Sequence, residues 1–150
     1  MTSASTTAPA ANARDLALAH YAARGVLEHV LAGHGVTFQQ QITLRAAATG
    51  ETPLTEDGLL AQVQGFLKAD QAGIRATIDE LLQRRLLAAE GGHLVPSDAG
   101  RELLAATGAE VAPLSARIWG GIPAEDLAAA GRVLALVTER AEAELAALNA

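Results

Sequence analysis

Gln71 and Arg75 carry a carboxamide and a guanidinium, two groups that can each form paired hydrogen bonds to a planar partner. Four residues apart, they share one face if the segment is helical, with Ala72 and Ala76 on or near the same side. Arginine pairs in this way with guanine, and glutamine with adenine. A merely solvated helix face is the alternative, and the helix-turn-helix pattern described below favours contact with bases or phosphates.

Five other residues are candidates for contacts with DNA phosphates. Lys68 lies in the turn before this surface, and we predict that it binds a phosphate rather than a base. Arg84 follows the same helix, where it either binds DNA or complements the helix dipole. His93 is either a phosphate contact or an exposed turn residue. Thr37 and Gln40 match a capping box, which we favour over phosphate binding because both roles need the same amides.

A second group of side chains could hold a small flat ligand. His20 falls on the apolar stripe of the first predicted helix. It is either a buried histidine satisfied by one hydrogen bond, which we favour, or part of a ligand site. Arg24, on an adjacent face, could hold a carboxylate. The predicted ligand-binding residues are His20, Tyr21, Arg24, Phe38, Gln41, Arg45 and Trp119.

Metal and enzyme chemistry have little support in the sequence. None of the four histidines is three or four residues from another, so no helical metal pair is predicted. A haem held by one histidine stays compatible with the sequence, although nothing selects for it. Because there is no phosphate-cradling glycine loop and no nucleophile elbow, we predict neither a cofactor nor an enzyme.

The elements that would position the DNA-binding candidates lie between Pro53 and Leu104. Thr55 can cap a helix over Glu56–Phe66, and Lys68–Gly73 then interrupts the helical pattern. Asp70 can cap the next helix, whose apolar residues recur with helical spacing and predict one buried face. That face is formed by Ile74, Ile78, Leu81 and Leu82.

A hairpin follows these two helices. Leu86–Ala89 and His93–Pro96 flank Gly91-Gly92, a typical hairpin signal. Together with a helix over Thr37–Thr49, these segments predict a winged helix-turn-helix in residues 36–97. The second helix of such a unit can enter the DNA major groove.

Residues 14–35 and 98–150 are predicted to be helical and to join two copies of the chain. Leu127, Leu134 and Leu148 lie at multiples of seven residues from one another, which is typical of paired helices. These helices either pack on their own subunit or intertwine with a second copy, and we predict the homodimer. Residues 1–13 are predicted to be a disordered leader.

Composition limits the fold class and the partners. Half of the chain is hydrophobic but only 3% is aromatic, which favours an aliphatic core and a mainly α protein with a small β-hairpin. A net charge of −6 argues against a general nucleic-acid coat protein but leaves room for a local basic surface. Without cysteine, disulfides and thiolate chemistry are excluded. No signal peptide or membrane span is recognisable, so we expect a cytoplasmic protein without membrane contact.

The order and spacing of these segments resemble the MarR family of bacterial transcription regulators over nearly all of the chain after residue 14. The resemblance implies a homodimer that binds a pseudo-palindromic operator in double-stranded DNA and usually represses. It also implies release by a small organic ligand, often aromatic or phenolic, between the dimerisation helices and the winged domain. The segments that carry the resemblance are Val36–Gln40, Ile74–Leu81, Arg85–Leu87 and Leu94–Arg101, the last of which resembles the family's "leucine, threonine, x, x, glycine" motif.

The wing departs from the family pattern. In the family it usually carries an aspartate–x–arginine motif, whose arginine enters the minor groove. Here the turn is Glu90-Gly91-Gly92-His93 and has no arginine. Between Lys68 and His93, four fixed positive charges are matched by four negative ones. The alternative function is therefore a ligand-binding protein on the same scaffold that has lost or weakened DNA binding.

Overall fold

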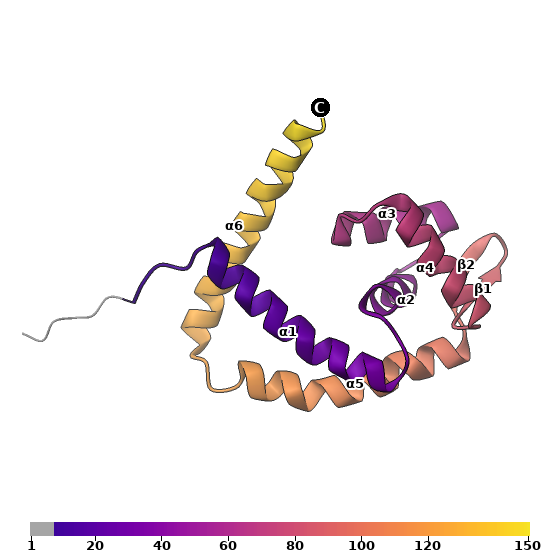
Figure 1. The fold of residues 1–150 in the computed structure, drawn as a ribbon, viewed down its shortest axis with the longest axis horizontal. Helices are drawn as coiled ribbons and strands as arrows, with labels where there is room; N and C mark the ends of the chain where they lie inside the picture. Colours follow the sequence, from indigo (N-terminus) through magenta and orange to yellow (C-terminus); the bar gives the residue numbers. More distant parts are fainter. Residues whose placement is uncertain (1–7) are drawn as a thin grey trace, which may run out of the picture. The chain divides into compact units, whose positions relative to one another are not determined.

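The computed structural model describes residues 8–150, which form a mainly helical chain with one two-stranded antiparallel sheet (Figure 1). The chain divides into two compact units, of which the first ends at Leu114 and the second comprises Ser115–Ala150. The predicted fold class is confirmed. In chain order the elements are α1 (Ala13–Gly33), α2 (Phe38–Thr49), α3 (Glu56–Leu67), α4 (Gln71–Gln83), β1 (Leu87–Glu90), β2 (His93–Pro96), α5 (Asp98–Trp119) and α6 (Ala124–Leu148).

The start of α1 is set by a capping box that the sequence prediction overlooked. The Asn12 side chain accepts hydrogen bonds from the backbone N–H groups of Arg14 and Asp15, and the Asp15 carboxylate accepts one from the Asn12 backbone. The helix therefore begins one residue earlier than predicted, at Ala13. Of the predicted leader, residues 8–12 have no regular structure and residues 1–7 lie outside the described part of the chain.

The next three helices begin at the predicted caps. Thr37 and Gln40 form the complete capping box of α2, Thr55 accepts a hydrogen bond from the N–H of Gly58, and Asp70 accepts one from the N–H of Gly73 at 3.1 Å. The break between α3 and α4 is shorter than predicted. It covers only Lys68–Asp70, because the Asp70 cap draws Gly73 into the first turn of α4.

One apolar core joins α2, α3, α4 and the hairpin. On α4, Ile74, Ile78 and Leu81 are fully buried, as the helical spacing predicted, and Leu82 packs against the core from its edge. The opposite side of α4 is left in solvent. The buried members of the core are Leu44, Ala46, Leu59, Leu60, Val63, Ile74, Ile78, Leu81, Leu86, Leu87 and Leu94.

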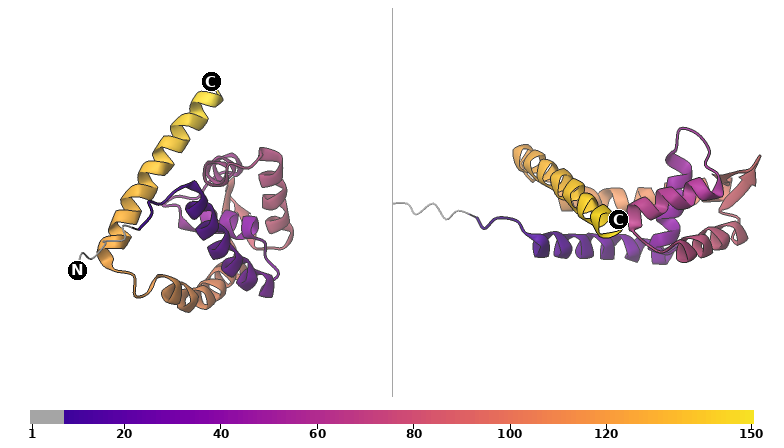
Figure 2. Two further views of the ribbon diagram at one scale, coloured as in Figure 1. Left: turned by 60° about the vertical axis from the view of Figure 1, so that its left-hand side comes forward. Right: turned by 90° about the horizontal axis from the view of Figure 1, so that it is seen from above.

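The hairpin lies at the edge of this unit, beyond the helices (Figure 2). β1 pairs with β2 from Leu87 opposite Pro96 to Glu90 opposite His93, and Gly91-Gly92 makes the turn with positive φ at both residues. β1 begins one residue later than predicted, because the Leu86 N–H bonds back to the end of α4. The Leu94 N–H also donates to the Leu54 carbonyl at 2.8 Å, which ties the hairpin to the α2–α3 connection.

The helices outside this core leave much apolar surface in solvent. Ser97 precedes α5, and its hydroxyl accepts a hydrogen bond from the N–H of Gly100; the helix then runs from Asp98 through Pro113 to Trp119. α6 lies in the second unit and has no buried residue. None of the described helices is long and apolar enough to cross a membrane.

Candidate nucleic-acid interface and ligand site

The predicted base-contacting surface lies on the solvent side of α4. Gln71, Ala72, Arg75 and Ala76 are all exposed, while Ile74 and Ile78 of the same helix are buried. The helix start is fixed by the Asp70 cap and the helix body by the core, so the surface sits on a rigid element.

Arg75 is paired within the protein. Its Nη1 lies 3.3 Å from Glu56 Oε1, and its Nη2 lies 3.1 Å from Asp57 Oδ1. Both acids belong to the first turn of α3, where they also complement the positive end of the helix dipole. The guanidinium of the predicted recognition helix therefore already carries two carboxylate partners across the turn.

Gln40 and Arg84 are used to hold the helices together. Gln40 is 6% exposed, and its Oε1 accepts hydrogen bonds from the Thr37 backbone at 3.1 Å and from Arg84 Nη1 at 3.1 Å. Its Nε2 donates to Glu80 at 2.8 Å, and Arg84 also donates to the Gly35 carbonyl at 2.9 Å. This network joins α2 to the end of α4, so capping and packing explain both side chains without DNA.

The two other basic candidates also have partners within the chain. Lys68 ends α3 in the left-handed conformation, with φ of 53°, and its ammonium donates to the Gly65 carbonyl at 2.6 Å. His93 is exposed at the hairpin turn, with Nδ1 3.1 Å from the Gly91 carbonyl. Residues 36–97 together hold five fixed positive and seven negative charges, which leaves this unit at −2. A phosphate-binding surface here has few cations to use.

Part of the predicted ligand group is brought together. The Arg24 guanidinium lies over the Phe38 ring, 4.2 Å from its centroid, and is paired with Glu28 at 3.0 Å. α1 and α2 thus place a cation and an aromatic ring in contact. His20 is exposed rather than buried in this single chain, and it meets Tyr21 edge to face at 5.9 Å, so the prediction of a buried histidine is wrong here.

Gln41 is the unusual member of the ligand group. It is 2% exposed, and among the described residues nothing donates a hydrogen bond to its Oε1. An acceptor that is buried without a donor lowers the free energy of unfolding by about 1–3 kcal/mol. Gln41 is one helical turn beyond Phe38 on α2. Arg45 is exposed, and Trp119 belongs to the second unit, where it is 55% exposed.

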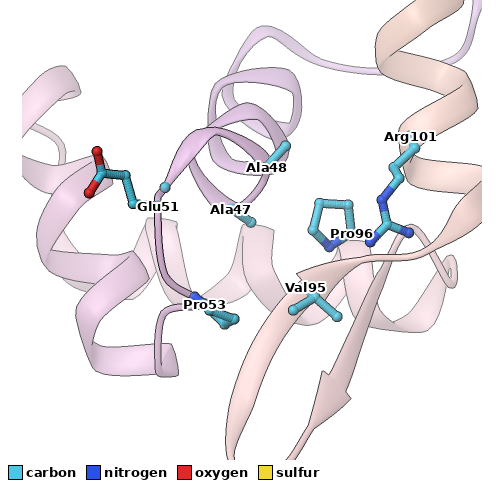
Figure 3. Close-up of a pocket in the computed structure, with 8 residues that line it drawn as sticks. Ala47, Ala48, Glu51, Pro53, Val95, Pro96 and Arg101 are labelled. Atoms are coloured by element: carbon cyan, nitrogen blue, oxygen red, sulfur yellow. The ribbon is translucent and has the colours of Figure 1, made fainter.

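A pocket of about 360 Å³ lies elsewhere in the first unit, between the end of α2, β2 and the start of α5. Arg101 reaches down beside Pro96, whereas the Glu51 side chain points away from them (Figure 3). None of the predicted ligand residues lines this pocket. The described residues include no group of three His, Asp or Glu side chains that could hold a metal ion.

The sequence interpretation missed the acidic partners of the candidate residues. The sequence pattern predicts Glu56 and Asp57 only as the first residues of a helix, and Glu80 is only one of the four negative charges between Lys68 and His93. His34, which ends α1, pairs with Glu110 of α5 at 2.8 Å and was missed as well. Each pair joins two different helices, so only the three-dimensional packing brings its members together.

The fold is shared with solved bacterial regulators. The chain is similar to Staphylococcus aureus MarR in complex with salicylate and kanamycin, at 18% identity and a TM-score of 0.74 over 87% of this chain and 90% of that one. A MarR family protein of Mycobacterium tuberculosis in complex with p-aminosalicylic acid matches at 16% identity and a TM-score of 0.66, over 86% and 99% of the two chains. CouR of Rhodococcus jostii RHA1 bound to p-coumaroyl-CoA matches at 20% identity and a TM-score of 0.65, over 79% of this chain and 85% of that one.

No protein-family model and no curated protein matches at the sequence level. The structural neighbours described above share only 16–20% of their residues with this chain, so they establish its fold alone. The chain has a winged helix-turn-helix fold, which several solved transcriptional regulators share. More particularly, its fold is that of the MarR family.

Proposed function

We propose that the chain is a DNA-binding transcriptional regulator of the MarR type, acting as a repressor, with α4 as its recognition helix. The observation that carries the proposal is the two-sided character of α4. Ile74, Ile78 and Leu81 anchor one side in the core, and Gln71 and Arg75 are presented to solvent on the other. A helix with this arrangement, following a capped turn, has what is needed to enter the major groove.

The proposal includes a homodimer that would offer two α4 surfaces to a pseudo-palindromic operator. The support is the apolar surface of α6, where six large side chains are between 38% and 81% exposed. Large amounts of exposed apolar surface usually mark an interaction site. Sedimentation at micromolar concentration is expected to give a dimer, and aspartate at both Leu134 and Val137 to give a monomer. A stable monomer of the unmodified chain would rule the dimer out.

We further propose that the ligand is a small aromatic carboxylate with a hydroxyl group. Arg24 would bind the carboxylate in exchange for Glu28, Phe38 would contact the ring, and a hydroxyl would donate to Gln41 Oε1. Salicylate and p-aminosalicylic acid, the ligands of two structural neighbours, have this chemistry. Ligand binding would alter operator affinity if it favours one of two conformations.

DNA binding is tested by fluorescence anisotropy with the duplex upstream of the protein's own gene, at two salt concentrations. We expect salt-sensitive binding that Arg75→Ala weakens about 5- to 150-fold, the range for loss of one bidentate base contact. Arg14→Ala removes an exposed arginine at the start of α1 and serves as the control, with no change expected. Equal effects of the two variants would contradict the role of α4.

Ligand binding is tested separately, by the melting temperature of the protein with and without salicylate. Stabilisation is expected to rise with ligand concentration. Arg24→Ala should abolish that rise, whereas Arg132→Ala, an exposed arginine of α6, should leave it intact. A rise that survives Arg24→Ala would place the ligand elsewhere.

One set of contacts favours the alternative, a ligand-binding protein on the same scaffold without effective DNA binding. Arg75 is paired with two acids, and Arg84 and Gln40 are engaged inside the protein. Absence of any DNA binding at low salt, together with saturable binding of salicylate, would select this function.

A further inference from the structure

The link between Arg75 and the start of α3 joins the two helices of the helix-turn-helix on their solvent side. The side chains of Arg75, Glu56 and Asp57 are 45%, 47% and 85% exposed, so the link is open to water and to an approaching duplex. Two of the five N–H groups of the guanidinium are used, one on each carboxylate. The other three remain for a further partner.

The charge of this cluster is as important as its geometry. One guanidinium and two carboxylates sum to −1, so a phosphate that approaches Arg75 meets net repulsion. To neutralise a phosphate fully, Arg75 must exchange a carboxylate for it. That exchange replaces one exposed ion pair by another, so it adds little to the free energy of DNA binding.

A guanine edge is a different partner. It offers two neutral acceptors, O6 and N7, in the spacing of an arginine fork, and such a contact discriminates about 5- to 150-fold between bases. It brings no negative charge of its own against Glu56 and Asp57. The cluster therefore opposes phosphate contact by Arg75 more strongly than it opposes base contact.

We propose that Glu56 and Asp57 are specificity-determining residues: they compete with DNA for Arg75 and so penalise duplexes that offer it only a phosphate. The inference rests on the proposed DNA-binding function and adds to it a mechanism that lowers non-specific binding. It also gives a role to the acidic balance of the winged unit. With only two carboxylates removed, α4 would become a stronger but less selective DNA-binding surface.

The test compares the double variant Glu56→Gln/Asp57→Asn with the unmodified full-length protein. Anisotropy is measured over a range of salt concentrations, with the upstream duplex and with a scrambled duplex of equal length and composition. Exposed ion pairs of this kind predict that affinity for scrambled DNA rises roughly 2- to 30-fold for each α4. The slope of log affinity against log salt should steepen by about 0.9 for each α4, because Arg75 becomes able to neutralise one phosphate.

Two controls separate competition from general charge. Glu51→Gln removes an exposed acid of the same unit away from Arg75, and it should change scrambled-DNA affinity much less. Adding Arg75→Ala to the double variant should abolish the gain, because the gain acts through that arginine. A melting curve of each variant checks that α3 remains folded.

Each outcome decides something. A gain that depends on Arg75 and is larger for scrambled DNA than for the upstream duplex supports the inference, and an equal gain on the two duplexes overturns it. Unchanged affinity, a gain that survives Arg75→Ala, or an equal gain in Glu51→Gln overturns it. In those cases binding of the upstream duplex by the unmodified protein leaves the proposed function intact. Failure of every variant to bind either duplex removes both.

Discussion

Replacing Gln41 by methionine should stabilise the protein, although it removes a polar group from a helix. Gln41 is 2% exposed and its Oε1 receives no hydrogen bond from the described residues. A buried acceptor without a donor costs about 1–3 kcal/mol, and methionine fills a similar space without that group. Gln41→Met should therefore raise the free energy of unfolding by about 1–3 kcal/mol.

The neighbouring residue provides a matched control of opposite sign. Gln40 is 6% exposed, but its amide makes three hydrogen bonds, to Thr37, Glu80 and Arg84. Two of these partners are charged, and hydrogen bonds to charged groups contribute about 1.5–3 kcal/mol. Gln40→Met should therefore destabilise the protein by an amount of that order. The two variants have the same chemistry one residue apart, so general effects of methionine on α2 cancel in the comparison.

The assay is thermal and urea unfolding followed by circular dichroism. For a chain of this size, each kcal/mol corresponds to about 3 °C in melting temperature, so the expected gain for Gln41→Met is about 3–9 °C. A destabilisation of Gln41→Met by about 1 kcal/mol or more would show that the amide is hydrogen-bonded in solution and would refute the reasoning. If Gln41 binds a ligand hydroxyl, the stabilised variant should also respond less to salicylate.

Two other predictions concern the elements that hold α4 and the hairpin in place. A Cβ at Gly100 would collide with the Leu86 carbonyl oxygen, so Gly100→Ala should destabilise the protein by about 2 kcal/mol or more in thermal unfolding. A Cβ at Gly108 on the same helix meets nothing within 4 Å, so Gly108→Ala should stabilise the protein by about 0.5–1 kcal/mol. Asp70→Ala should cost about 1 kcal/mol because it removes the α4 cap, and Asp70→Asn, which keeps an acceptor, should cost much less in urea unfolding. Equal stability of Gly100→Ala and Gly108→Ala would contradict the steric argument, and equal stability of Asp70→Ala and Asp70→Asn would contradict the capping argument.

The fold was largely predictable because the residues that start and end its helices act locally. Thr37, Thr55 and Asp70 each bond to an amide three residues ahead, and such a cap depends only on residue type and spacing. The apolar face of α4 was predictable for the same reason, since a period near 3.6 survives whatever the helix packs against. Errors were confined to element ends, as at Asn12 and Leu86, where one hydrogen bond shifts the boundary by one residue.

Contacts between elements were not predictable in this way. The bridge from Leu54 to Leu94 spans 40 positions, and no pattern in the sequence relates the two residues. Arg75 and its partners Glu56 and Asp57 lie on different helices, and an arginine on an exposed face was equally compatible with water, DNA or a carboxylate. Which partner it takes depends on the crossing of α3 and α4, and that crossing is set by core packing rather than by surface residues.

Gln40 and Gln41 show where the sequence ceases to distinguish roles. They are identical in type, adjacent on α2 and both buried, yet one amide joins two helices and the other leaves its oxygen without a donor. A rotation of 100° about the helix axis separates them, and it directs Gln40 toward Glu80 and Arg84. Natural proteins tend to break local rules of stability at functional sites. The unsatisfied oxygen of Gln41, one turn beyond the Arg24–Phe38 contact, is therefore the strongest reason to look for the ligand at this end of α2.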